Sequence, residues 1–360
     1  MTGAAPAPVT QRNRKPLAVV TGALVASGLV AGALWFVRPT PGPLDTVPTA
    51  TLIVADVDFE KLRESPLWDT ARAALATRVP VDKLDAACGF ATLSRLDRGV
   101  LAIGEGEAGG VGLALNGRIA NEELLRCQTQ LVIGAAGTTR NEFSGSSAHG
   151  SFLLTPLRLA DVDLVLGVGL RRPMLVATPH WAETMADAAD APDKNSYLRL
   201  LGGSLPLPEP HGAVRAHLER AAGGVPLLVA VSAKMPAGQG NLVKQLGQFL
   251  PTAELAARAR DIHEPRAAGA SLLTSSQGKR TTLRLVIDAG TDASAASVRD
   301  VLLGTRLALG QNLMLRLAGV GKILDGVAVT LDGSWVTATL EDTTEAMLGH
   351  VAKLRELGGR

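Results

Sequence analysis

Two pairs of aspartates have the spacing that acid–base or metal chemistry would need. Asp56 and Asp58 belong to an Ala-Asp-Val-Asp sequence at the end of an apolar run that begins at Thr51. Asp161 and Asp163 belong to a second Ala-Asp-Val-Asp sequence. Residues two apart on a strand point to the same face, so each pair would bring two carboxylates together for general acid–base catalysis or calcium binding. The simpler interpretation, which we favour, is a strand-edge pair in which Asp58 caps the next helix.

A glycine-rich stretch offers a nucleotide-binding pattern. Gly104 to Gly109 matches G-x-G-x-x-G and follows a predicted strand. A dinucleotide site also needs a helix after the glycines, whose N-terminus holds the phosphates. Val111 to Leu115 predicts another strand instead, and Glu105 and Glu107 would repel phosphate. We interpret the stretch as a turn and predict no cofactor.

Nucleophile patterns are present but incomplete. Gly145 to Gly150 contains Ser147 and His149 but is one residue too long for G-x-S-x-G, and no strand–turn–helix surrounds it. Ser276 and Lys279 match S-x-x-K across a predicted hairpin turn rather than at a helix start. The sequence therefore predicts no catalytic residue and a protein that is not an enzyme, with a dispersed hydrolase site left open.

The six histidines form no local zinc motif, because none is part of H-E-x-x-H or of an i, i+4 pair. No metal site is predicted. These histidines are His149, His180, His211, His217, His263 and His350.

Cys88 and Cys127 are the two cysteines of the chain. An even cysteine number in an exported domain favours a disulfide, whereas two buried thiols would be normal in the cytosol. Because the topology argued below directs the domain outward, we predict a Cys88–Cys127 disulfide.

Strands and helices alternate in the pattern of an α+β protein with mainly antiparallel sheets. A strand is predicted over 51–57, and Ser65-Pro66 then has the chemistry of a helix start. Hairpins are predicted over 162–178 and 272–287, with helices over 179–185, 239–250 and from Thr291. The nearest common arrangement is the ferredoxin-like split unit, one in each half of the chain. We expect extracytoplasmic units over 51–203 and 204–360, divided at a Pro- and Gly-rich stretch.

The last unit allows the register to be predicted. Asp332-Gly333 is a strong hairpin signal, and a two-residue loop there places Val329 opposite Val336. Asp342 with Glu345 then resembles a capping box that starts the final helix.

The N-terminus predicts a membrane anchor. Residues 1–16 contain three basic residues and no acid, and 17–37 is a stretch of 21 residues without charge. As a helix it would be roughly 32 Å long, enough to cross a hydrocarbon core of about 30 Å. Residues 38–50 hold four prolines and predict a stiff spacer.

The orientation follows from the basic tail. By the positive-inside rule, residues 1–16 are cytoplasmic and the rest is periplasmic, which predicts a single-pass inner-membrane protein. A signal peptide cleaved near Ala33 is the alternative, but the apolar stretch exceeds the usual signal length. The G-x-x-x-G spacing of Gly28 and Gly32 is compatible with a homodimer of this helix.

Charge argues against a nucleic-acid partner. The chain has 36 basic and 34 acidic residues, and without 1–37 it keeps 33 basic and 34 acidic residues. A protein that neutralises many phosphates needs a basic surface. A hydrophobic fraction of 46% is enough to form a core, which excludes a wholly disordered chain.

The layout resembles a known group of proteins. The basic tail, apolar segment and Pro-rich spacer come first, followed by Ser65-Pro-Leu-Trp68, Cys88-Gly-Phe90, Arg126-Cys127 and a terminal hairpin and helix. This is similar to uncharacterised, single-pass, membrane-anchored envelope proteins of high-GC Gram-negative bacteria. The resemblance implies no activity and no site residues. We expect a non-enzymatic interaction or envelope-assembly module, with a carrier or chaperone for an apolar ligand as the alternative.

Overall fold

The computed structural model describes residues 41–358, except for 78–80, 106–108, 121, 125, 128, 131–144, 160–161, 171, 192–206, 236–251, 261, 263–264, 276, 314–315 and 317–319. The predicted tail and transmembrane helix over 1–37 therefore lie outside the described residues. So do the boundary at 203/204 and the helix predicted over 239–250. Within the described part, no helix is both long enough and apolar enough to cross a bilayer.

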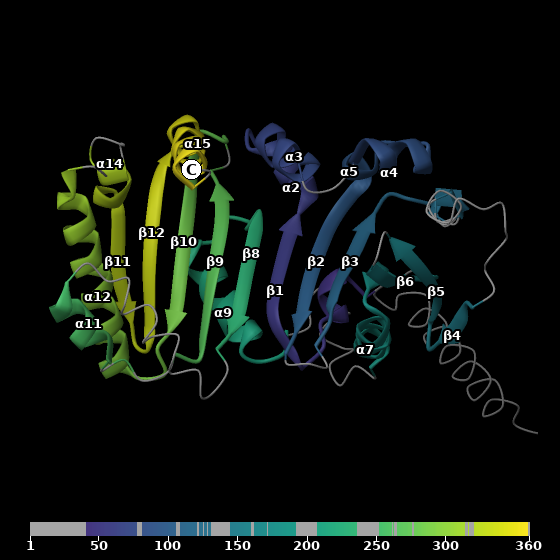
Figure 1. The fold of residues 1–360 in the computed structure, drawn as a ribbon, viewed down its shortest axis with the longest axis horizontal. Helices are drawn as coiled ribbons and strands as arrows, with labels where there is room; N and C mark the ends of the chain where they lie inside the picture. The colour runs from purple at the N-terminus through teal and green to yellow at the C-terminus, as the bar shows by residue number, and fades with distance from the viewer. Residues whose placement is uncertain are drawn as a thin grey trace, which may run out of the picture. The chain divides into compact units, whose positions relative to one another are not determined.

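The strands of the described residues form one antiparallel sheet in the order β11-β12-β10-β9-β8-β1-β2-β3-β7-β6-β5-β4 (Figure 1). They are β1 (Thr51–Asp58), β2 (Leu96–Gly104), β3 (Val111–Gly117), β4 (Ser147–His149), β5 (Phe152–Leu159), β6 (Val162–Gly169), β7 (Met174–Ala177), β8 (Val229–Lys234), β9 (Ala267–Thr274), β10 (Arg280–Asp288), β11 (Val327–Asp332) and β12 (Trp335–Thr343). The predicted α+β class with antiparallel strands is confirmed.

Helices connect and cover the strands. They are the 3₁₀ helix η1 (Pro43–Thr46), α2 (Phe59–Glu64), α3 (Trp68–Ala76), α4 (Val81–Cys88), α5 (Thr92–Arg95), α7 (Pro179–Asp190), α9 (His211–Ala221), α11 (Ala253–Arg260), α12 (Asp292–Gln311), α14 (Val320–Asp325) and α15 (Thr344–Gly358). Thr178 precedes α7 with Pro179 at its first position, as the sequence predicted.

The two halves of the sheet have the same strand order. Counted outward from the centre, β1-β2-β3-β7-β6 corresponds to β8-β9-β10-β12-β11, and β12 lies between β10 and β11 as in a split unit. The halves are not separate sheets, because β1 pairs with β8. The similar sequences at Ser65-Pro66 and Thr178-Pro179 follow β1 and β7, which are not equivalent strands, so they do not mark this repeat.

One face of the sheet, which we call the covered face, is packed under helices. Trp181 and Met185 of α7 are buried against residues such as Ala102, Ala114 and Leu175. Val214 and Leu218 of α9 pack on Ala230, Ala267 and Val286. A Cβ atom on Gly269 would collide with Val214, so this glycine lets α9 approach β9 closely.

Part of the predicted spacer belongs to the folded domain. Thr46 and Val47 are buried, and Val47 packs with Val54, Val100 and Leu207. Because η1 contacts β2, β3 and α7, the prolines here stabilise a packed turn rather than an extended spacer.

The final hairpin differs from its predicted register. Asp332 pairs with Trp335, and Val329 lies opposite Ala338 rather than Val336. The loop is therefore Gly333-Ser334, with Gly333 at a φ of 57° in the first loop position, a left-handed conformation that glycine adopts readily. The shift is two residues, so the apolar face is unchanged. The cap also moves: the Ala346 amide donates to the Thr343 hydroxyl, and α15 begins at Thr344.

Candidate functional site

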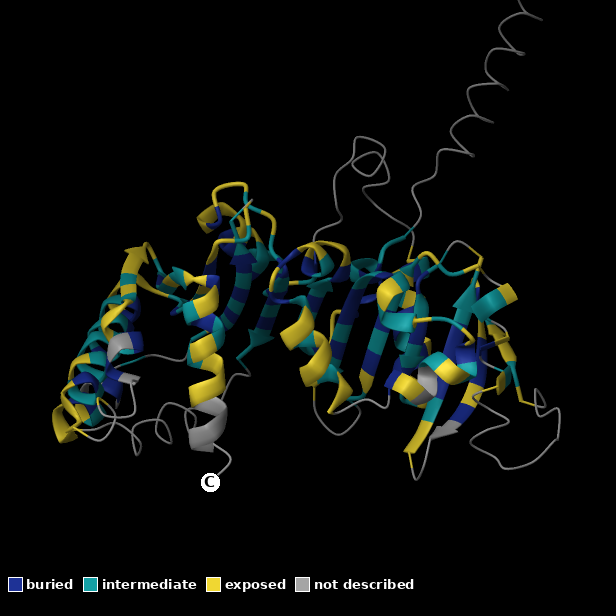
Figure 2. Ribbon diagram, turned by 90° about the horizontal axis from the view of Figure 1, so that it is seen from above, coloured by how far each residue is buried: buried dark blue, intermediate teal, exposed yellow. Residues whose placement is uncertain are grey.

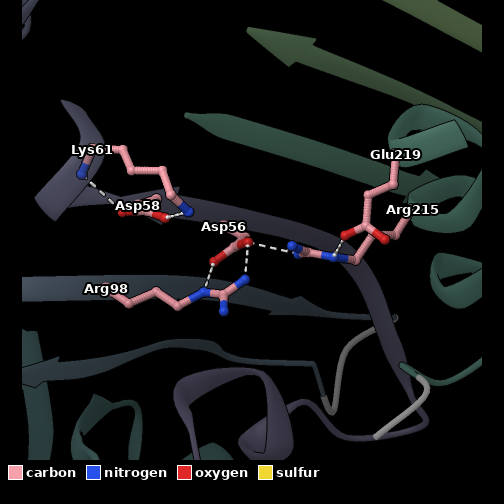
Figure 3. A network of polar contacts seen from close by, with 6 residues as sticks. All are labelled: Asp56, Asp58, Lys61, Arg98, Arg215 and Glu219. Atoms are coloured by element: carbon pink, nitrogen blue, oxygen red, sulfur yellow. Dashed lines mark hydrogen bonds and ion pairs between the residues drawn. The ribbon is translucent and has the colours of Figure 1, made fainter. Parts of the chain in front are cut away.

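The predicted Asp56–Asp58 pair separates into two structural roles. Asp58 caps α2, because its carboxylate accepts a hydrogen bond from the Lys61 amide at 3.0 Å. Asp56 is 5% exposed and lies on the covered face. Arg98 donates to both of its oxygens at 2.7 Å, and Arg215 of α9 donates to Oδ2 at 2.6 Å (Figure 3). The simpler interpretation of the sequence is confirmed for Asp58.

This network favours an Asp56 carboxylate that is ionised at neutral pH. Burial alone would raise the pKa of Asp56, but the hydrogen bonds and charges of Arg98 and Arg215 outweigh it and hold the pKa below its usual value. Asp56 raises the pKa of Arg98 in return. A carboxylate saturated by two guanidinium groups is a poor general base at neutral pH. The site links β1, β2 and α9 and has no catalytic geometry.

Among the residues that the structure describes, the other sequence patterns are not assembled into a catalytic site. Of the second aspartate pair, Asp163 is exposed and Asp161 lies outside the described residues. Gly104 donates to the Gly110 carbonyl in the turn between β2 and β3, so no helix follows this glycine as a phosphate site requires.

The described residues of the two serine patterns form no serine–base pair. His149 of β4 contacts Asp187 of α7 at 2.8 Å, but no hydrogen bond joins it to Ser147 among the described residues. Lys279 is exposed, and Ser276 lies outside the described residues. Among all the residues that the structure describes, no group of three His, Cys, Asp or Glu residues could hold a metal ion.

Two histidines have buried positions that the sequence did not indicate. The His211 ring contacts the Ser232 hydroxyl at 2.8 Å and the Thr51 carbonyl oxygen at 2.9 Å, and burial lowers its pKa. The His217 ring stacks on Trp335 with centroids 4.5 Å apart. His350 contacts Asp342 at 3.0 Å, His180 is exposed, and His263 lies outside the described residues.

The predicted disulfide is present between Cys88 at the end of α4 and Cys127. Their Cα atoms are 4.1 Å apart, and both residues are 7% exposed. The bond joins residues that are 39 positions apart. The bond ties the end of α4 to the described helical residues around Cys127, which follow β3 in the chain.

Partly exposed apolar side chains gather on the face opposite the covered face. In the middle strands, every second residue is apolar and only partly buried, which Figure 2 shows as alternating bands along the strands. Leu283 and Leu285 are 44% and 41% exposed, and Val111 is 48% exposed. We call this surface the open face, formed by Ile53, Ala55, Leu101, Ile103, Val111, Leu113, Val231, Ala233, Ala268, Ala270, Leu283 and Leu285.

Among the described residues, helices cover this side of the sheet at its margins. At one end of the strands, Leu62, Leu67 and Leu348 pack with Val57 and Leu272. Toward β11, α12 packs on Val336 and its neighbours. Figure 1 shows α9 behind β8 and β9, and no described helix lies in front of the middle of β10, β9, β8, β1 or β2. The open face is therefore an apolar surface between two packed margins.

The open face is shallow. Four alanines occupy its centre on β9, β8 and β1, and the larger Leu283, Leu285, Leu101 and Ile103 flank them on β10 and β2. A separate cavity near Leu96, Met174 and Arg172 has a volume of about 50 Å³. That is far below the several hundred Å³ of typical small-molecule sites.

Comparison with known proteins gives only a distant structural similarity. No protein-family model matches the chain, and no curated protein matches it. Crystal form III of TP0453 covers 85% of this chain and 95% of its own, with 10% identity and a TM-score of 0.41. Crystal form I covers 88% and 99%, with 12% identity and a TM-score of 0.33. At these values the similarity assigns neither a family nor a function to the chain.

Proposed function

We propose that the protein is a membrane-anchored, extracytoplasmic binding module without enzymatic activity, which acts in envelope assembly by docking a partner protein on its open face. The observation that carries this proposal is the exposed apolar surface in the middle of the sheet. Contiguous apolar surface of this kind is typical of interaction sites in soluble domains. The lack of an assembled catalytic group among the described residues agrees with it.

The occupant we propose is an amphipathic helix of the partner. Helices cover the opposite face and both margins of the open face, so a further helix would complete the same layer. The central alanines leave room for its apolar side chains between Leu285 and Leu101. A carrier for a small apolar ligand is less well supported, because such a ligand needs a concave site that buries most of its surface.

The anchor remains a prediction from residues 17–37, as do the inner-membrane location and the homodimer through Gly28 and Gly32. The test is the intact mass of the protein from the membrane fraction. We expect a mass that includes residues 1–33, because the apolar segment suits a span better than a cleaved signal. A chain that begins near Leu34 would mean a soluble exported protein and would remove the anchor from the proposal.

Docking on the open face can be tested by photo-crosslinking in the full-length protein in native membranes. A photoreactive residue at Leu285 is expected to crosslink to one exported protein, at a peptide with apolar residues spaced i, i+3 and i+4. The same residue at Thr330, which is exposed on the opposite face of β11, is the matched control. Adding Leu283→Asp should abolish the Leu285 product, because a charge would then be buried in the contact.

Several outcomes would overturn this docking proposal. Crosslinks to lipid would favour an apolar-ligand carrier instead. Crosslinks to residues 236–251 of the same chain, or to a second copy, would show that the chain itself covers the face. An identical product from Thr330 would show that the capture is not specific to the open face.

A further inference from the structure

Two buried histidines attach helix α9 to the covered face of the sheet. His211, the first residue of α9, contacts the Ser232 hydroxyl of β8 at 2.8 Å and the Thr51 carbonyl oxygen of β1 at 2.9 Å. His217 contacts the Thr337 hydroxyl of β12 at 3.2 Å. Because β10, β9 and β8 lie between β12 and β1, the two histidines fix one helix across the middle of the sheet.

The surroundings of His211 suit a neutral ring. A carbonyl oxygen can only accept, so Nε2 carries the proton and donates to Thr51, and Nδ1 accepts from the Ser232 hydroxyl. His211 is 0% exposed and stands at the N-terminus of α9, where the helix dipole disfavours a positive charge. Burial is the main cause that lowers the pKa of His211, and the charge of Lys234 on β8 adds to it.

The surroundings of His217 also suit a neutral ring. The residue is 6% exposed, and its Nδ1 is buried without a hydrogen-bond partner in the described part of the protein. The charged imidazolium form has a proton on both nitrogens, whichever nitrogen carries the proton in the neutral form. Protonation would therefore bury a charge and an N–H group at Nδ1 that has no acceptor. Burial lowers the pKa of His217 as well.

The charged groups around α9 do not reverse this preference. Glu209 favours a charged His211. Asp332 of β11 and Asp288 of β10 favour a charged His217, while Arg220 of α9 and Arg284 of β10 oppose it. Strand β9 carries no charged residue. The remaining charged groups that we consider on the elements packed near α9 form ion pairs with one another, namely Asp56 with Arg98 and Arg215, Glu219 with Arg215, and Glu341 with Arg280.

We propose that His211 and His217 make α9 an acid-released cover of the sheet, which detaches from the covered face when both rings gain a proton in solvent. A histidine binds a proton more tightly in water than in these two sites, so a lower pH favours the detached helix. Release would expose Val214 and Leu218, which now pack on the sheet. The strands stay paired with one another. The proposal does not depend on docking at the open face, which lies on the other side of the sheet.

The test is hydrogen exchange of the full-length protein in detergent at about pH 7.5 and about pH 5.5, corrected for the effect of pH on intrinsic exchange. The ordinary pKa of histidine, 6.5, lies between these values. The equilibrium constant for opening of α9 should therefore rise by up to about tenfold for each histidine, or about 100-fold for both. Amides of β9 and β10 should keep their protection, because their partners are other strands.

Three variants identify the groups that respond to pH. His211→Gln keeps a donor and an acceptor in the place of the ring but does not titrate, so it should remove about tenfold of the rise. His217→Gln should remove a further part. His180→Gln replaces an exposed histidine of α7 and should leave the pH dependence of α9 unchanged.

Two results of the exchange experiment would overturn the proposal. Equal protection of α9 at both pH values would show that acid does not release it. A parallel loss of protection in α9, β9 and β10 would be global unfolding rather than release of one helix. If the glutamine variants do not fold, titration of the histidine rings by NMR in the wild type gives an independent measurement. A His211 or His217 ring that titrates near 6.5 while α9 stays protected would also refute the proposal.

Discussion

Asp56→Asn is expected to lower the free energy of unfolding by about 3 kcal/mol at neutral pH, as removal of one partner from a buried ion pair generally does. Asp56 is 5% exposed and receives hydrogen bonds from Arg98 and Arg215. Without the carboxylate, the guanidinium groups of Arg98 on β2 and Arg215 on α9 would lie close together with no anion between them. Chemical denaturation followed by circular dichroism would measure the loss.

Asp56→Asn should also make the free energy of unfolding depend less on pH under acidic conditions. The pKa of Asp56 is lower in the folded protein than its ordinary value of 3.8, so the unfolded chain takes up the proton first as the pH falls. Its contribution is therefore complete above about pH 4 and is lost as the pH falls through the folded-state pKa. The difference between wild type and Asp56→Asn should shrink in that range.

Glu219→Gln is the matched control for Asp56→Asn. Glu219 also pairs with Arg215, at 2.8 Å, but its side chain is 53% exposed. Exposed pairs contribute about 0–1 kcal/mol, so a small change is expected. If Asp56→Asn were as mild as Glu219→Gln, or if its stability fell with pH in parallel with the wild type, Asp56 would not be the electrostatic link between β1, β2 and α9.

Removal of the Cys88–Cys127 disulfide should have an effect of similar size. The bond closes a loop between residues 39 positions apart, for which the chain-entropy relation gives about 4 kcal/mol. Cys88→Ala/Cys127→Ala is expected to unfold at lower denaturant than the oxidised wild type. Hydrogen exchange should rise most in α4 and in the described helical residues from 122 to 130, which the bond ties together.

Reduction provides the control for the disulfide prediction. The wild type in excess dithiothreitol should match the double variant, whereas the double variant itself should not respond to dithiothreitol. The intact oxidised protein should be lighter than the reduced protein by two hydrogen atoms. Two thiols that react in the unreduced, unfolded protein would refute the bond and, with it, the argument for an oxidising compartment.

Local sequence patterns predicted the elements whose signals lie within a few residues. Strand propensity predicted the 162–178 hairpin, and a Thr-Pro helix start predicted the helix from Pro179. Apolar residues at helical spacing predicted the long helix from Asp292. The 332–335 turn shows the limit of such reasoning. Asp332-Gly333 predicted the position of the hairpin correctly. In the structure, however, Asp332 pairs with Trp335, so the loop begins at Gly333, whose φ is 57°.

The site residues depended on contacts that no local pattern records. Asp56 stood out as a charge in an apolar strand, yet its partners are 42 and 159 residues away in the sequence. The same holds for His217 and Thr337, which are 120 residues apart. The small and apolar residues of β8 and β9 favour strands. They do not predict which face of the sheet the helices cover, because both faces of these strands carry small or apolar residues.

The central position of β1 has a consequence for how the chain folds during synthesis. Its partner strands are β2, which follows soon after it, and β8, which is synthesised much later. Until β8 arrives, the first half of the sheet ends in an unpaired strand edge, and such an edge can pair with another chain. At that stage Asp56 is already paired with Arg98 of β2, so the edge carries an ion pair and lacks only the contact with Arg215. A fragment that stops before β8 should therefore associate through the free edge of β1 more readily than the full chain.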